Sequence, residues 1–278
     1  MTAPEADLTG WTASPFSAEG ITHDVYRKGD GPGVVLIPEI PGITPQVLAL
    51  GNHLVDNGFS VACPSLFGQP GRPLSVGYLV PTVARACVAR EFMALATDAE
   101  RPVARYLRAL ARDLNERTPG KGVGVIGMCF TGGFALGMMV DEFVLAPVLS
   151  QPSQPFPISK RHKADIGISD ADLARVKERA AAGQCVLGLR FTRDPFCFEA
   201  RFETLRRELG DKFVAVEIDS APGNPYGHPK NAHSVLTHHL VDQEGAPTRA
   251  ALDKTLAFFR ENLGVGAGPG PRPEGMGP

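Results

Sequence analysis

The 278-residue sequence has little of what marks several common classes of protein. Its formal net charge is only -2, with acidic and basic residues interspersed, so it offers no basic stripe of the kind that binds nucleic acid. No apolar run approaches the length of a membrane span, and residues 1–10 hold Glu5 and Asp7 without a signal-like apolar core. We therefore expect a cytoplasmic protein with neither a nucleic acid nor a membrane as partner.

Cysteine is also scarce, and its number is odd. The five cysteines are Cys63, Cys87, Cys129, Cys185 and Cys197, and no two of them lie close together in the sequence. This spacing excludes a disulfide framework and a Cys-x-x-Cys metal pattern. We expect reduced thiols, which suits a thiolate nucleophile.

Short apolar runs are abundant, and they alternate with helical patterns. The runs at 33–37, 59–63 and 122–126 are continuous and bounded by Gly or Pro, as in strands covered on both faces. Further strands are predicted at 143–149, 185–191 and 213–218, and the main helices at 45–57, 102–117, 134–140, 169–182, 198–209 and 248–263. This alternation predicts an α/β fold: a doubly wound, mostly parallel sheet with helices on both faces, in a single domain over residues 1–263.

Two segments interrupt the alternation. Residues 68–100 exceed what a strand connection needs and contain an apolar helical pattern at 83–95, which could wall an active site or simply pack as a helix. Residues 264–278 are nearly all Gly, Pro and Ala, which predicts a disordered tail.

One cysteine stands out by its surroundings. Cys129 lies in Gly-Met-Cys-Phe-Thr-Gly-Gly, residues 127–133, where an apolar run ends and passes through small residues into another. This pattern is typical of a nucleophile elbow, in which a strand turns sharply into a helix and the nucleophile occupies the strained tip. Amides at the start of that helix would favour a thiolate and could hold a developing oxyanion. A buried, inert cysteine is the alternative.

A nucleophile needs a base and a carboxylate that orients the base. Asp194 follows a predicted strand in Thr-Arg-Asp-Pro, and it either supplies that carboxylate or caps the next helix. For the base, the loop after the last strand offers His233 and His228, of which His233 is favoured by position. We expect the following pair, His238 and His239, at the surface.

A second carboxylate lies at the end of another apolar strand. Glu39 is part of Pro-Glu-Ile-Pro-Gly, residues 38–42, at the edge where ligands bind in such sheets. In the same loop the amide of Ile40 could pair with that of Phe130 to form an oxyanion hole. A glutamate in this place can also be merely solvated.

Together these motifs resemble the dienelactone hydrolase family of α/β-hydrolases, over roughly residues 34–263. The resemblance lies in the elbow, the loop of Glu39, the Arg-Asp-Pro of Asp194 and the Ala-His-Ser of His233. It implies an α/β-hydrolase fold and a triad of Cys129, Asp194 and His233. It also implies that Glu39 pairs with the thiol at rest and helps to remove its proton when substrate enters.

The sequence departs from this family in two places. Thr131 stands where the family elbow usually has glycine, and Thr237 stands where an arginine one helical turn after the catalytic histidine helps to hold the substrate carboxylate. The second departure argues against a dienelactone as the substrate. Arg72, Arg85 and Arg90 could supply another anion contact, or could simply lie at the surface.

We therefore expect a carboxylic ester or lactone hydrolase that acts on a small molecule through a thioester intermediate. Such chemistry needs no metal and no organic cofactor. A monomer and a homodimer both remain open, as do two alternative functions on the same fold, an acyltransferase and a non-catalytic small-molecule binder.

Overall fold

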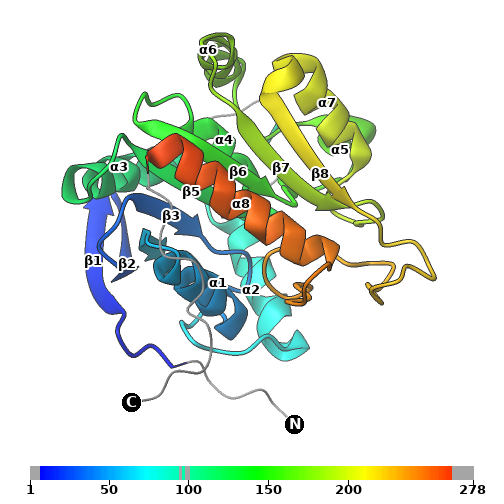
Figure 1. Ribbon diagram of the computed structural model, residues 1–278, viewed down its shortest axis with the longest axis horizontal. Helices are drawn as coiled ribbons and strands as arrows, with labels where there is room; N and C mark the ends of the chain where they lie inside the picture. Colours follow the sequence, from blue (N-terminus) through cyan, green and yellow to red (C-terminus); the bar gives the residue numbers. More distant parts are fainter. Residues whose placement is uncertain (1–6, 94–95, 98–100, 265–278) are drawn as a thin grey trace.

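The computed structural model describes residues 7–264 except 94–95 and 98–100, and these residues form one eight-stranded sheet with helices on both faces (Figure 1). The strand order is β1-β2-β4-β3-β5-β6-β7-β8. The strands are β1 (Thr12–Ala18), β2 (Ile21–Lys28), β3 (Gly33–Ile37), β4 (Ser60–Pro64), β5 (Val123–Met128), β6 (Val144–Ser150), β7 (Val186–Phe191) and β8 (Phe213–Ile218). Apart from its first residue, the predicted tail at 264–278 lies outside the described residues.

All six predicted strands are present, as β3 to β8, and each pairs with its neighbours among them in parallel. The predicted doubly wound, mostly parallel sheet is thereby confirmed. The sequence patterns did not indicate β1 and β2, which form an antiparallel extension of the sheet. Their residues are mostly partly or fully exposed, so neither strand carries the continuous apolar run of a strand covered on both faces.

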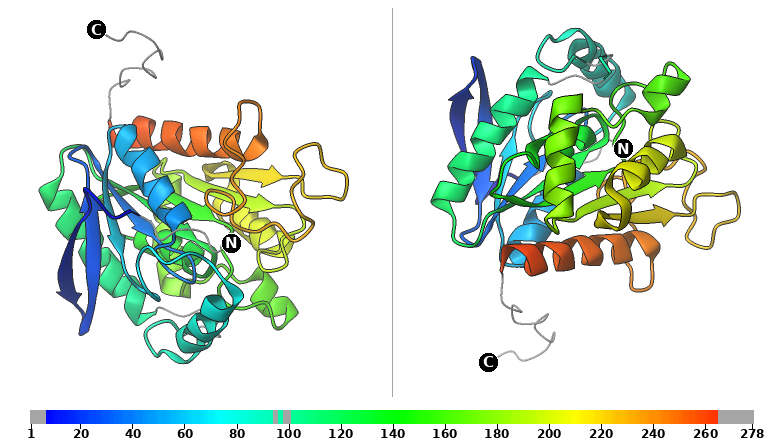
Figure 2. Two further views of the ribbon diagram at one scale, coloured as in Figure 1. Left: turned by 90° about the horizontal axis from the view of Figure 1, so that it is seen from below. Right: turned by 90° about the horizontal axis from the view of Figure 1, so that it is seen from above.

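The helices form two layers (Figure 2). Helices α1 and α8 pack on one face of the sheet, and α3, α4, α6 and α7 pack on the other. The helices are α1 (Pro45–Asp56), α2 (Val76–Val88), α3 (Pro102–Arg117), α4 (Gly132–Met138), α5 (Lys160–Ala164), α6 (Asp170–Ala181), α7 (Glu199–Leu209) and α8 (Pro247–Leu263), with short 3-10 turns η1 (Cys129–Thr131) and η2 (Gly210–Lys212).

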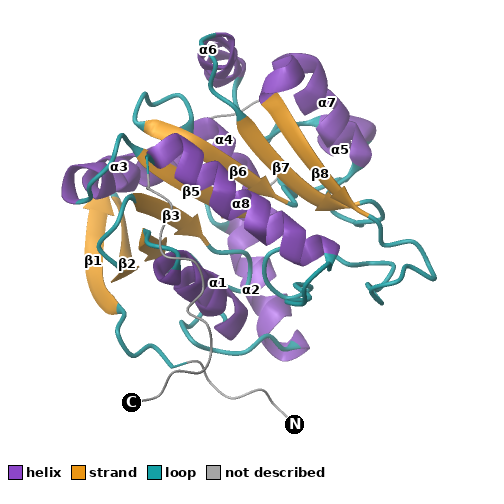
Figure 3. Ribbon diagram, in the orientation of Figure 1, coloured by secondary structure: helices purple, strands orange, loops and turns teal. Residues whose placement is uncertain are grey.

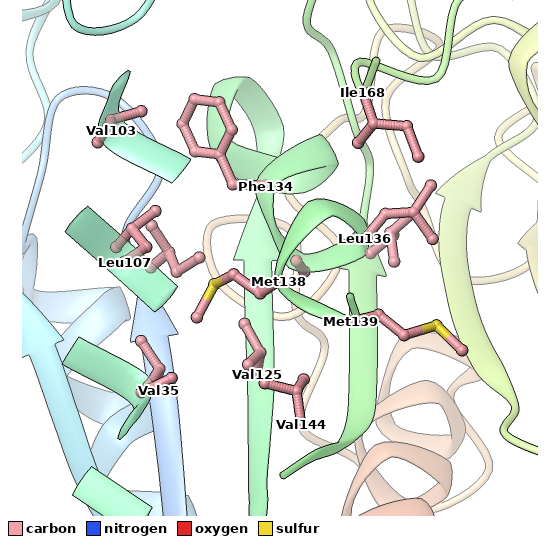
Figure 4. Close-up of a cluster of buried hydrophobic side chains, with 14 of the residues drawn as sticks. Val35, Val103, Leu107, Val125, Phe134, Leu136, Met138, Met139, Val144 and Ile168 are labelled. Carbon is pink, nitrogen blue, oxygen red and sulfur yellow. The ribbon is translucent and has the colours of Figure 1, made fainter. Parts of the chain in front are cut away.

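The core between the sheet and α3 and α4 shows why the strand runs are continuously apolar (Figure 4). Val35 of β3 and Val125 of β5 face Leu107 of α3 and Met138 of α4, and all four side chains are fully buried. The next residue along β3, Val34, lies in the core under α1 and α8. Since full burial of such a side chain stabilises by about 1.5–3 kcal/mol, both faces of these strands favour large apolar residues.

The helix predicted at 83–95 is wrong in its position, because α2 spans Val76–Val88. Pro81 lies inside the helix, where it removes one backbone donor without ending it. The chain turns after Val88, where the amide of Phe92 donates to the carbonyl of Ala89 at 3.2 Å. The Tyr78 hydroxyl of α2 donates to the Pro41 carbonyl at 3.2 Å, so α2 is tied to the loop after β3.

Within the described ranges, no helix combines the length and apolar character needed to cross a bilayer. All five cysteines are free thiols, as expected. The arrowheads of the parallel strands point toward one edge of the sheet (Figure 3). The segments that follow β3, β5, β6 and β7 therefore meet there.

Candidate active site

The sharp strand-to-helix turn expected at Cys129 is present. Strand β5 ends at Met128, and Cys129 follows with φ of +53°, a conformation that costs a non-glycine residue about 1–3 kcal/mol. Glycine is needed on both sides of Cys129, at Gly127 and at Gly132. A Cβ on Gly127 would lie 2.4 Å from the carbonyl oxygen of Thr131, and one on Gly132 would lie 2.5 Å from the backbone of Pro152. The tight crossing leaves Cys129 partly exposed at the edge of the sheet.

Asp194 and His233 form a direct pair. Nδ1 of His233 lies 2.6 Å from Oδ2 of Asp194, whose side chain is fully buried. The other carboxylate oxygen, Oδ1, accepts the amides of Phe196 at 2.8 Å and Cys197 at 3.1 Å. Asp194 therefore does not cap α7, whose N-cap residue is Phe198. One of its oxygens caps the turn after β7, and the other holds the histidine ring.

The charge on His233 depends on the thiol beside it. Burial of the ring opposes protonation, but the nearby Cys129 sulfur and the Asp194 carboxylate, which accepts a hydrogen bond from Nδ1, outweigh it and raise the pKa of His233 well above its ordinary value. In the described part of the chain, the buried Nε2 atom of this ring has no hydrogen-bond partner. The geometry is that of a cysteine and histidine pair with the ring held from behind by Asp194.

His228, the rival base, faces elsewhere. Its ring packs against Phe191 at 5.0 Å between centroids, and its backbone amide donates to the side chain of Asn224 at 2.9 Å. Burial lowers the pKa of His228. Of the two histidines, only His233 contacts Asp194.

Glu39 is buried, but the expected resting pair with the thiol is not formed. Its Oε2 accepts the Ser234 hydroxyl at 2.7 Å and the Gln151 amide at 3.4 Å, and its Oε1 accepts the Thr237 hydroxyl. Among the described residues, no hydrogen bond or ion pair joins Glu39 to Cys129. The neutral donors come mainly from the loop between β8 and α8, residues 219–246, called here the histidine loop. Thr237, which stands in the arginine's place, is one of them.

Two supporting residues were missed by sequence reasoning. Gln151 directly follows β6, is fully buried with φ of +37°, and accepts the amide of Val235 at 3.2 Å. Its place at the end of a predicted strand was the available signal. His239, expected at the surface, is only partly exposed, and its Nδ1 accepts the amides of His233 at 3.3 Å and Ser234 at 3.2 Å. No sequence pattern distinguished it from His238.

The role of His239 predicts a pH dependence of stability. Burial, with smaller contributions from His238, His233 and His228, lowers its pKa to about 4, so the folded ring stays neutral where the unfolded ring is protonated. This contribution is complete above about pH 6.5 and is lost as pH falls toward 4. The His239→Asn variant would keep an acceptor without titrating. Between pH 6.5 and 4.5, the free energy of unfolding of this variant in urea should fall by about 1 kcal/mol less than that of wild type. The figure is kept small because the ring is partly exposed.

Parallel pH profiles of the free energy of unfolding for wild type and the His239→Asn variant would contradict this assignment. The matched control is His238→Asn, because His238 is exposed and supplies only a smaller part of the shift, so this variant should change the profile much less than His239→Asn does.

The segment after β3 supplies a possible oxyanion donor. In the described part of the chain, the amide of Ile40 donates to no protein acceptor. The amide of Phe130 belongs to the elbow itself, and the Phe130 ring packs among Phe67, Phe92 and Phe156, with centroids 5.8, 5.5 and 5.5 Å away. This aromatic cluster shields one side of the elbow from water. Among the side chains that the structure describes, no group of three or more His, Cys, Asp or Glu could hold a metal ion.

Comparisons with known proteins agree with this fold. The profile of the dienelactone hydrolase family matches residues 22–263. A protein of Saccharomyces cerevisiae that carries the provisional name carboxymethylenebutenolidase is 26% identical over 204 residues, which are 70% of each chain. A dienelactone hydrolase-like promiscuous phosphotriesterase from metagenomic libraries has a similar fold, with a TM-score of 0.60 at 17% identity over 91% of this chain and 99% of that one. A dienelactone hydrolase of Anabaena variabilis has a similar fold as well, with a TM-score of 0.57 at 16% identity over 91% of this chain and 98% of that one.

Proposed function

This chain belongs to the dienelactone hydrolase family and is accordingly a hydrolase of ester or lactone bonds, and we propose that it works through a cysteine acyl-enzyme. The observation that carries the proposal is the 2.6 Å pair of His233 with the buried Asp194, beside the thiol at the elbow. A binder would not need a nucleophile, a base and an orienting carboxylate arranged in this order.

In the proposed reaction the Cys129 sulfur attacks the carbonyl carbon of the substrate. The carbonyl oxygen becomes an oxyanion, which the amides of Ile40 and Phe130 hold. The carbon–oxygen bond then breaks, and the leaving alkoxide takes a proton from His233, which leaves a thioester on the sulfur. Water gives a proton to His233 and attacks the thioester, and the carbon–sulfur bond breaks to release the acid and the thiolate.

In the free protein, Glu39 would hold the histidine loop through Ser234 and Thr237. The family resemblance implied that Glu39 helps to remove the thiol proton when substrate enters. To do so here, its carboxylate would first leave these contacts and turn toward Cys129. We also propose a small-molecule substrate, a cytoplasmic location and a monomer or homodimer. The net charge of -2 supports neither a nucleic acid nor an anionic membrane as a partner.

The substrate is predicted to be a small neutral ester or lactone. Glu39 places a buried carboxylate beside the site, and Thr237 replaces the arginine that would attract an anion. Loss of one bidentate guanidinium contact commonly costs a few kcal/mol, or roughly two powers of ten in selectivity. We therefore expect kcat/KM for neutral lactones to equal or exceed that for matched lactones that carry a carboxylate, measured with purified protein.

A Thr237→Arg variant is the matched test of this explanation, and it should shift the preference toward the carboxylate-bearing lactone. If wild type strongly preferred the anion, another cation such as Arg85 or Arg90 would be the contact, and the explanation from Thr237 would be wrong. If the purified protein hydrolysed no ester or lactone, the proposed function itself would be wrong.

A further inference from the structure

The elbow contains a side chain that the proposed reaction does not use. Thr131 lies two residues after the nucleophile and is fully buried. Its hydroxyl oxygen accepts the amide of Met128 at 3.0 Å, and it lies 2.9 Å from the carbonyl oxygen of the same residue. The carbonyl oxygens of Ile37 and Pro38 lie 3.1 and 3.3 Å away. A hydroxyl has one hydrogen to donate, so these three carbonyls share it.

This hydroxyl joins two segments that are far apart in the sequence. The carbonyls of Ile37 and Pro38 end β3 and lead directly into Ile40, whereas Met128 ends β5 and leads into Phe130. The two proposed oxyanion donors therefore extend from the two backbone segments that Thr131 connects. A glycine in this place would leave the same amide and carbonyls without that link.

We propose that Thr131 is a positioning residue that fixes the amide of Ile40 relative to that of Phe130, an inference that rests on the proposed function. The two amides must converge on one oxygen, at about 2.7–3.1 Å from the position that the oxyanion will take. Neither segment alone sets the distance between the two amides, because they lie on different segments. The pairing of β3 with β5 and the Thr131 hydroxyl both hold these segments together. Misplacement of a donor by a fraction of an ångström weakens the transition state more than the bound substrate.

Three substitutions separate positioning from packing. Thr131→Val keeps the shape and removes the hydroxyl, Thr131→Ser keeps the hydroxyl, and Thr131→Gly introduces the family's usual residue. With a neutral ester, we expect kcat of Thr131→Val to fall at least about tenfold, while KM stays within about threefold of the wild-type value. The expected fall is smaller than the roughly hundredfold or greater loss seen when an oxyanion donor is removed, because the donor is misplaced and not lost. Thr131→Ser should restore most of kcat, and Thr131→Gly should resemble Thr131→Val.

Two further measurements exclude a general structural effect. Alkylation of Cys129 by iodoacetamide should change less than about threefold, because the pair with His233 does not involve the oxyanion hole. The control is Thr255→Val in α8, which also removes a fully buried hydroxyl, one that donates to the Ala251 carbonyl at 2.8 Å. It should leave kcat unchanged even where it lowers Tm.

Wild-type kcat in Thr131→Val, or in Thr131→Gly if the valine variant does not fold, would overturn the inference. So would a fall in kcat accompanied by an equal fall in Cys129 alkylation, because the whole elbow would then have moved. If wild-type protein forms no acyl adduct on Cys129, the proposed function fails and this inference falls with it. A wild type that forms the adduct, together with a fully active Thr131→Val, rejects the role of Thr131 alone.

Discussion

Replacement of Cys129 by alanine should lower esterase activity by at least about a thousandfold, because members of a catalytic triad act as a unit. The fold should survive, since alanine fills no more space at the elbow and tolerates the same backbone conformation about equally well. Intact-protein mass spectrometry during turnover of a slow ester should show a thioester adduct on wild type and none on the variant. Activity and mass together test the nucleophile and the intermediate.

The matched control for this variant is Cys87→Ala, which removes an exposed thiol on α2 far from the elbow in sequence. Cys87→Ala should keep both the activity and the adduct. A Cys129→Ala protein with more than about a tenth of wild-type activity would show that another group attacks the substrate.

The His233→Ala variant should be nearly inactive, with a loss of roughly three powers of ten, because it removes both the proton carrier and the partner of Asp194. His228→Ala is the internal control. This histidine lies in the same histidine loop but packs on Phe191, so its loss should lower kcat/KM by no more than about threefold. Rates on one ester, with circular dichroism to verify folding, decide between the two.

The reverse result, an inactive His228→Ala and an active His233→Ala, would transfer the role of base to His228 and would require the histidine loop to rearrange on substrate binding. Equal loss in both variants would indicate damage to the loop rather than loss of a base. In that case, alkylation of Cys129 should fall in both proteins alike.

The sequence was most informative where burial alone decides structure. Strands such as β3 and β5 are covered on both faces, so their runs are apolar without interruption, and the residues at their ends could be placed at one edge. The sequence thereby predicted that Glu39, Cys129 and Asp194 lie near one another at this edge. The exposed strands β1 and β2 lacked such a signal, because their stability comes from pairing with a sheet that the local sequence does not encode.

Partner choice within the site could not be predicted in the same way. Glu39 binds Ser234 and Thr237, which lie far later in the chain, and the geometry of the histidine loop alone decides which donors reach it. The same holds for His239, because two adjacent histidines with similar neighbours differ only in which ring turns inward. Contacts of this kind depend on loop conformation, which hydrophobic periodicity does not describe.

The separation of the proposed triad residues along the chain has a consequence for biosynthesis. A ribosome completes the elbow at Cys129 well before the strand that leads to Asp194, and it completes the histidine loop only shortly before α8. A nascent chain therefore exposes an ordinary thiol, without the base and orienting carboxylate that would activate it. In the proposed mechanism, the sulfur becomes reactive only once the last strands have joined the sheet, when most of the chain is already folded. The reactive group would then be absent during the stage at which a protein is most exposed to side reactions.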